Sequence, residues 1–375
     1  MPVASPARKA ARNSNLELLR IVFMALIVFH HFVVHGGDVV FASRPSLHSI
    51  IVDVATMAGQ VGVDGFVLVT GYFFGKAKRS HALRTASLYW QTTTYGLIIM
   101  AVLVVGGVWQ PTARDVWQTV VASPFVWWWF MSAYMALLLL SPALVVMLEN
   151  LSQRLHLYTI AAGLVLFVLL PQFVDVSPFM GYLSWFAYLS ILANYAARYR
   201  LPGQDRPWLW LVLAAVGLAA GCARAEWLYG SAVGVAWNPQ NAAELLGRNY
   251  LPNLLCAVGL FMFFSGLKAR HSKLVNWLGG ATLGVYLIHD HPQVRAWLWG
   301  WLQPGAHFEG RGYYLYALAC VAGVYAATTA LSLVHEQLLM RPFRWVWRRA
   351  ALARADAKAR AKAVGADPTQ GSDGR

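Results

Sequence analysis

Several ionisable residues interrupt the first apolar stretch of the sequence, residues 16–35, and two of them have a spacing that could do chemistry. Arg20 and His31 are eleven positions apart, which on a helix corresponds to about 16 Å along the axis and only about 20° around it. We therefore expect both side chains on one face of a single helix. An imidazole can accept a proton near neutral pH, and a guanidinium can bind phosphate or polarise a carbonyl. The pair predicts a site where a general base lies on the same stripe as an anion-binding group.

Each of these residues also has a purely structural interpretation. Arg20 can extend to the cytoplasmic interface with help from Glu17, and His31 can pack in the core with a hydrogen bond to a neighbouring carbonyl. His35 returns to the face of His31, but two histidines without a third ligand at suitable spacing make a poor metal site. We predict no metal.

Further polar residues occur in two other apolar stretches. Asp64 lies inside residues 50–74 and requires a cation such as Arg20 or another donor. The stretch 274–290 ends in GVYLIHDHP, which contains Tyr286 and His289. His289 and His31 both lie about fifteen residues after the cytoplasmic start of their segments. Because each helical residue adds the same rise, we expect the two histidines at similar depth in the membrane. A polar helix end at the interface is the alternative for His289.

The composition indicates whether these segments lie in water or in a lipid bilayer. The chain has 375 residues, of which 58% are hydrophobic and 12% charged, whereas soluble domains carry about a quarter charged residues. This excludes a water-soluble enzyme and predicts an all-α polytopic membrane protein. The net charge of +14 does not indicate nucleic-acid binding, because the cations cluster between apolar stretches, as membrane orientation requires. The three cysteines lack metal-ligand or redox spacing.

Ten stretches qualify or nearly qualify as membrane spans by length and apolarity, the sixth and ninth being short, and we expect the first to be a retained helix rather than a cleaved signal peptide. They are residues 16–35, 50–74, 83–108, 125–148, 157–174, 181–197, 208–229, 250–267, 274–290 and 312–340. With both termini cytoplasmic, 23 of the 30 Lys and Arg residues lie inside. We predict a basic cytoplasmic segment 1–15, a transmembrane region 16–340, and a basic tail 341–375 that is largely disordered near anionic lipid headgroups.

The polar residues also resemble those of a known family. Arg20 and His31 match the Arg-x10-His pattern of the membrane-bound acyltransferase-3 family. GVDGFVLVTGYFF, WWWFMSAYMALLLLSP and GVYLIHDHP are similar to three further segments of that family, in the same order along the chain. The resemblance covers residues 15 to 340 and implies that residues 16–340 form a transmembrane acyltransferase domain.

The resemblance implies an O-acyltransferase of the cytoplasmic membrane that modifies a glycan. The donor would be cytoplasmic acetyl-CoA or another acyl-CoA, and the acceptor a hydroxyl of a polysaccharide or lipid-linked oligosaccharide. Membrane lipids and other proteins of envelope or exopolysaccharide synthesis would be its partners. His31 would be the catalytic histidine and Arg20 would engage the donor, while Asp64, Tyr286 and His289 match lesser motif positions. Thr70 replaces a serine, and the Arg-x-x-Arg pattern is absent, leaving Arg79 and Arg84 among the nearby candidate donor contacts.

Two other function classes fit parts of the sequence. A multi-span transporter could use buried His, Asp and Arg residues for a substrate or proton pathway, although the internal repeat that many transporters show is not visible here. A non-catalytic scaffold or sensor of an envelope-synthesis complex is the second alternative. Loss of function on substitution of His31 would argue against the scaffold.

Overall fold

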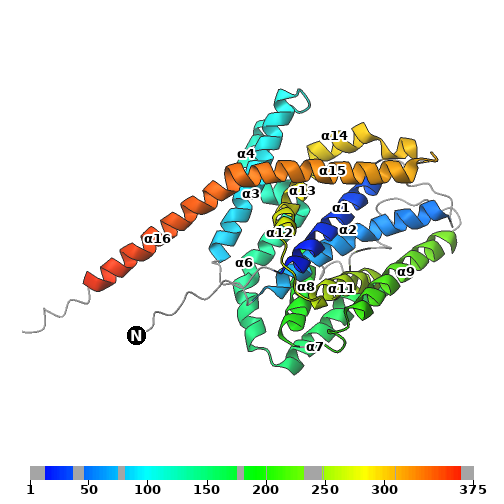
Figure 1. Cartoon of the computed structure of the whole chain (residues 1–375), viewed down its shortest axis with the longest axis horizontal. Helices are drawn as coiled ribbons and strands as arrows, with labels where there is room; N and C mark the ends of the chain where they lie inside the picture. The colour runs from blue at the N-terminus through cyan, green and yellow to red at the C-terminus, as the bar shows by residue number, and fades with distance from the viewer. Residues whose placement is uncertain are drawn as a thin grey trace, which may run out of the picture.

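The fold is a bundle of helices. The computed structural model describes residues 13–36, 46–74, 81–174, 181–199, 201–231, 247, 249–308 and 310–364, and within these it contains no strand. The α-helices are α1 (Ser14–Val34), α2 (Leu47–Tyr72), α3 (His81–Val105), α4 (Ala113–Val121), α5 (Ser123–Val126), α6 (Trp129–Asn150), α7 (Gln153–Leu164), α8 (Tyr182–Arg198), α9 (Pro207–Ser231), α11 (Leu251–Gly266), α12 (Lys273–Gly279), α13 (Thr282–His289), α14 (Pro292–Leu302), α15 (Tyr313–His335) and α16 (Arg341–Val364). α1 and α2 cross the middle of the molecule, and α9 lies beside α11 (Figure 1).

Most of the predicted spans correspond to single long helices. In the part of the chain that the structure describes, seven helical segments are long and apolar enough to cross a membrane: Ser14–Val34, Leu47–Tyr72, Leu83–Val105, Trp129–Asn150, Gln153–Gln172, Pro207–Trp227 and Tyr313–Ala357. α11 is apolar but shorter, and the predicted spans 181–197 and 274–290 contain α8 and the pair α12 and α13. The prediction of an all-α polytopic membrane protein is confirmed, whereas ten crossings with both termini inside stays a prediction.

Glycines on α2 allow it to pack closely against α1. A Cβ atom built on Gly65 would lie 2.1 Å from the Phe23 ring, and one on Gly62 would lie 2.7 Å from the Phe23 carbonyl oxygen. Gly71 meets α8 in the same way, at Ser190. Small residues permit such close backbone approach between membrane helices. α2 is thereby fixed against both α1 and α8, whose ends contribute to the site described below.

The ninth predicted span is broken near its middle. α12 ends at Gly279 and α13 begins at Thr282. Two hydroxyls bind carbonyl oxygens at the break: Thr282 Oγ1 donates to Gly279 over 3.0 Å, and Ser332 Oγ of α15 donates to Ala281 over 2.9 Å. Such substitute hydrogen bonds make a helix break tolerable away from water. α13 is therefore a short separate helix that ends at His289.

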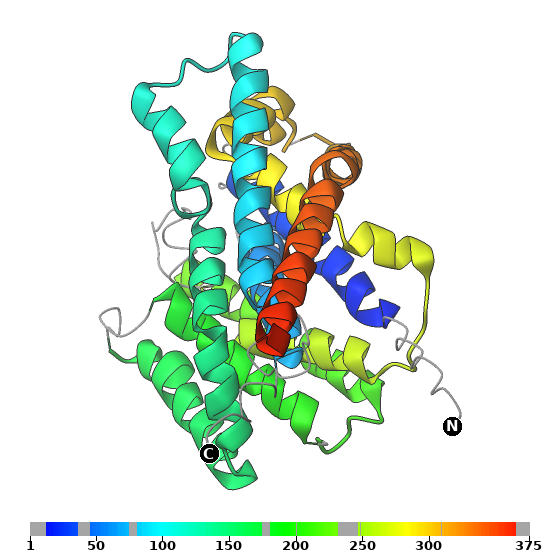
Figure 2. The ribbon, with the colours of Figure 1, turned by 90° about the vertical axis from the view of Figure 1, so that its left-hand side faces the viewer.

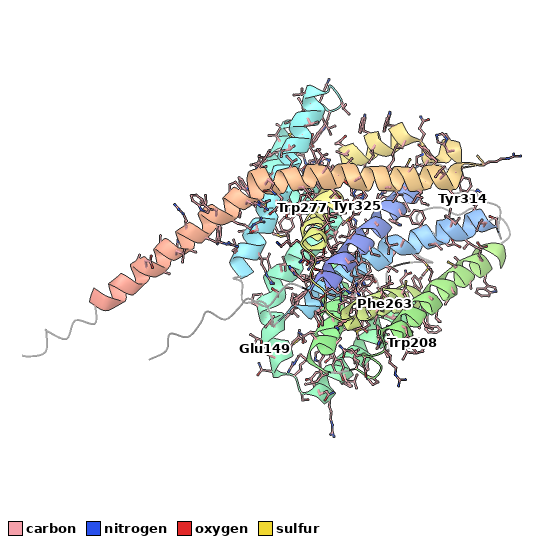
Figure 3. The ribbon with its side chains drawn as sticks, viewed as in Figure 1. Glu149, Trp208, Phe263, Trp277, Tyr314 and Tyr325 are labelled. Atoms are coloured by element: carbon pink, nitrogen blue, oxygen red, sulfur yellow. The ribbon has the colours of Figure 1, made fainter. Side chains whose placement is uncertain are left out.

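α15 and α16 form one long rod joined by a π-helical turn, Glu336–Met340. Tyr325 of α15 contacts α1, where its hydroxyl donates to the Ile21 carbonyl oxygen over 3.4 Å (Figure 3). α16 projects beyond the bundle in Figure 1 and lies in front of the other helices in Figure 2. We expected a largely disordered tail, but residues 341–364 are helical, because Ala, Arg and Lys are strong helix formers. Residues 365–375 lie outside the described part of the chain.

Candidate active site

His31 lines a cavity of about 200 Å³ at the C-terminal end of α1. The residue is only 8% exposed. The cavity is formed by α1, α2, the first residues of α6 and α8, the end of α13 and the start of α14; its lining residues are Ile27, His30, His31, His35, Gly59, Gln60, Val63, Trp129, Tyr182, Tyr286, Asp290 and Arg295. The helix ends that meet here are those predicted to face the extracytoplasmic side.

The hydrogen bonds around His31 determine which ring nitrogen can act on a ligand. His289 Nδ1 lies 2.6 Å from the Val285 carbonyl oxygen, which can only accept, so Nδ1 carries the hydrogen. In the neutral ring His289 Nε2 is then an acceptor, and it lies 2.9 Å from His31 Nδ1. His31 Nδ1 therefore donates, and its lone pair is on Nε2. This is the tautomer that a general base at the cavity requires.

The carboxylate of Asp290 lies close to His31 and His35, and the guanidinium of Arg295 lies beside that carboxylate. Asp290 Oδ1 is 3.7 Å from His31 Nδ1 and 4.0 Å from His35 Nε2. Arg295 Nη1, from the first turns of α14, lies 3.3 Å from the same oxygen. Asp290 is buried, at 3% exposed, while the Arg295 side chain is 35% exposed. The carboxylate thus has a counter-charge, and Arg295 presents the remainder of its guanidinium at the cavity.

The same carboxylate completes a group that could bind a metal ion. One donor atom each from His31, His35 and Asp290 lie within 4.8 Å of one another. The sequence offered only the two histidines, since Asp290 is distant in the chain. The positive charge of Arg295 beside Asp290 opposes a cation at this position.

Arg20 does not contact His31 in the structure. Its Nη1 lies 2.8 Å from Glu17 Oε1 in an ion pair, and the side chain is 23% exposed. Arg20 is absent from the residues that line the His31 cavity. Arg20 and His31 therefore lie toward opposite ends of α1, with His31 near the C-terminal end and the Arg20–Glu17 ion pair near the N-terminal end.

Three motif residues occupy different surroundings. Asp64 is fully buried and accepts a hydrogen bond from Trp185 Nε1 over 2.8 Å, so its donor comes from α8 and the expected Arg20 partner is not the one observed. Thr70 donates to the Phe66 carbonyl oxygen, and its Oγ1 lies 3.0 Å from the Tyr134 hydroxyl. Tyr286 lines the cavity. Of these three, only Tyr286 belongs to the His31 site.

The predicted donor contacts after the second span lie elsewhere. Arg79 falls outside the described residues. Arg84 lies in the first turn of α3, partly buried, and does not line the His31 cavity.

Sequence reasoning missed several lining residues, chiefly Arg295, Trp129, Tyr182 and Gln60. Arg295 lies between the predicted spans 274–290 and 312–340, in a segment for which we predicted no site residue. The signal that could have identified it is its spacing from Asp290. The two residues are five positions apart on either side of the helix start at Pro292, which allows them to form an ion pair. Trp129 and Tyr182 begin helices whose first turns were predicted to lie at the outer surface.

Known proteins give one direct comparison. The model of the acyltransferase domain of the acyltransferase-3 family matches residues 13–334. No curated protein and no solved structure matches the chain. The matched residues run from the start of α1 almost to the end of α15 and include both His31 and His289. The chain belongs to the acyltransferase-3 family and is a membrane acyltransferase.

Proposed function

We propose that the protein is an O-acyltransferase of the cytoplasmic membrane, which moves an acetyl or other acyl group from cytoplasmic acyl-CoA to a hydroxyl of an envelope or secreted glycan. The observation that carries the proposal is the hydrogen-bonded series from Val285 through His289 to His31, which leaves the lone pair of His31 on Nε2 in a residue that lines a cavity. A fixed tautomer next to a cavity is the arrangement that general-base acyl transfer needs.

In the proposed reaction His31 Nε2 accepts the proton of the acceptor hydroxyl. The hydroxyl oxygen attacks the thioester carbonyl carbon, the C–S bond breaks, and an oxygen ester forms. The proton passes from His31 to the departing sulfur, which leaves as the thiol of CoA. Atoms and charge balance without a further co-reactant. His289 does not touch the substrate and acts as a positioning residue for His31.

Arg20 has a separate part in the proposal, at the cytoplasmic end of the same helix. The phosphates of an acyl-CoA entering from inside would compete with Glu17 for its guanidinium, because Arg binds both anions in the same geometry. The excess of predicted cytoplasmic cations attracts the same polyanionic donor. Substitution of Arg20 by Ala should therefore act mainly on the KM for acyl-CoA.

The proposal is tested with purified protein in lipid nanodiscs and acyl-CoA labelled in the acyl group. His31→Ala should lower transfer to glycans isolated from the host envelope by about 10²- to 10⁴-fold, the contribution of a general base. His271→Ala is the matched control, because His271 is exposed between α11 and α12 and does not line the cavity. Full transfer by His31→Ala would contradict the proposed base. Solute uptake into vesicles without dependence on acyl-CoA would instead indicate a transporter.

A further inference from the structure

The His31 cavity combines aromatic rings with a charged pair. Trp129 and Tyr182 are the first residues of α6 and α8, and their ring centroids lie 4.7 Å apart with the planes inclined by 40°. Their side chains remain partly exposed, at 38% and 46%. Two neighbouring rings of this kind give the cavity an apolar surface with hydrogen-bonding groups at its edges.

Besides the histidines and Tyr286, the polar part of the lining includes Asp290, Arg295 and Gln60. The ion pair at 3.3 Å sets the carboxylate and guanidinium in fixed positions, and together they offer both acceptors and donors. Gln60 adds an amide that can do either. A ligand that satisfies this lining must present several hydroxyls and also a face of C–H groups.

The size of the cavity limits such a ligand to one small unit. Its volume of about 200 Å³ lies below the range of about 300–1,000 Å³ found for sites of drug-sized molecules. A single sugar ring has the required combination of an apolar C–H face and a rim of hydroxyls. A metal ion would meet the charge of Arg295, and a lipid tail would desolvate the ion pair.

We propose that this cavity is a subsite for one pyranose ring of the acceptor, which stacks its C–H face on Trp129 and Tyr182. Asp290 and Arg295 bind neighbouring hydroxyls, and the hydroxyl to be acylated lies at His31 Nε2. The inference rests on the proposed function, since it is the base at His31 that gives the bound hydroxyl its role. Acceptor choice is thereby assigned to side chains at the starts of α6, α8 and α14.

The test uses small acceptors of known chemistry. Labelled acetyl-CoA is incubated with the protein in nanodiscs and with methyl glucoside, methyl galactoside or methyl mannoside, and in parallel with the acyclic polyol sorbitol. Trp129→Leu keeps an apolar side chain but removes the ring, whereas Trp129→Phe keeps a ring. Trp208→Leu is the control, because Trp208 of α9 (Figure 3) is 59% exposed and is not among the residues that line the cavity.

We expect at least one methyl pyranoside to be acetylated in preference to sorbitol. Trp129→Leu should raise the KM for that pyranoside about tenfold, the equivalent of one aromatic contact, with a smaller change in the KM for acetyl-CoA. Trp129→Phe should recover most of the loss, and Trp208→Leu should behave as wild type. Tyr182→Leu repeats the measurement if Trp129→Leu does not fold.

The two proposals fail in different ways. Equal use of sorbitol and pyranosides, or an unchanged pyranoside KM in both leucine variants, would overturn the sugar subsite while His31-dependent transfer still stands. Absence of any acyl transfer from acyl-CoA by the wild-type protein, to these probes or to envelope glycans, would overturn the proposed function itself.

Discussion

His31 Nδ1 lies 2.9 Å from His289 Nε2, although 258 residues separate the two histidines in the chain. The contact joins the first helix of the bundle to the short helix α13. Because His289 Nδ1 is committed to the Val285 carbonyl oxygen, the hydrogen bond has only one direction in the neutral pair. The relative position of α1 and α13 therefore decides the tautomer of His31.

Replacing His289 tests this relationship. His289→Ala removes the acceptor for His31 Nδ1, so the ring loses its orientation, and kcat should fall by about 10- to 100-fold. His289→Gln offers an amide oxygen to His31 and an amide N–H to Val285, and should retain more activity than the alanine variant. The measurement is kcat and KM for acyl transfer as a function of pH. Equal activity of wild type and His289→Ala would remove the positioning role.

The ion pair of Asp290 and Arg295 predicts non-additive effects on stability. Arg295→Gln leaves a buried carboxylate without its counter-charge and should lower the free energy of unfolding by about 1–3 kcal/mol, below the value for a fully buried pair because Arg295 is partly exposed. Adding Asp290→Asn should restore part of that loss. Thermal unfolding in detergent of the two single variants and the double variant gives the coupling. Strictly additive losses would show that the two side chains do not interact.

The close approach of α1 and α2 predicts an intolerant glycine. Gly65→Ala would place a Cβ atom 2.1 Å from the Phe23 ring, and overpacking of this kind costs about 1–3 kcal/mol. Gly323→Ala on α15 is the control, since nothing lies within 4 Å of its Cβ position. That variant should be neutral or more stable because Ala favours a helix. The ratio of folded to aggregated protein after heating, read by size-exclusion chromatography, compares them.

The predicted orientation can be measured directly. With ten crossings and the N-terminus inside, a fluorescent protein fused after Arg375 should fold in the cytoplasm. A single cysteine at Gly310, introduced into a variant lacking Cys222, Cys256 and Cys320, should react with an impermeant maleimide added from outside. A cysteine at Ser272 should react only after the membrane is opened. Labelling of Ser272 from outside would contradict the predicted topology.

The helices and the histidine pair could be predicted from local sequence. Apolar length gives membrane helices directly, and equal distance from the start of two outward spans places His31 and His289 at the same depth. The direct contact between them agrees with that expectation. The spacing along α1 also places Arg20 and His31 on the same face of the helix. It does not predict which side chains each of them contacts, and Arg20 forms an ion pair with Glu17.

The remaining part of the site depends on tertiary arrangement that no local pattern contains. Trp185 reaches Asp64 from α8, 121 positions along the chain, so the donor of that carboxylate could not be read from α1 or α2. Arg295 joins the cavity because the chain turns at Asp290 and Pro292 and starts α14 there. The helical tail was missed for a different reason, because its charge suggested solvation more strongly than its alanines suggested a helix.

The break between α12 and α13 leaves His289 without a continuous helix to the loop at residues 267–272, whereas His31 is joined to that loop by α1. A continuous helix transmits any rotation or shift of its first turn to its last, whereas α13 is anchored by Ser332 of α15 and by its contact with α1. A shift of α12 is therefore not passed to α13 along an unbroken helix, because α12 ends at Gly279 and α13 begins at Thr282. A displacement of that loop would instead reach His31 through α1, because Asn15 in the first turn of α1 donates hydrogen bonds to the Leu267 and Lys268 carbonyl oxygens.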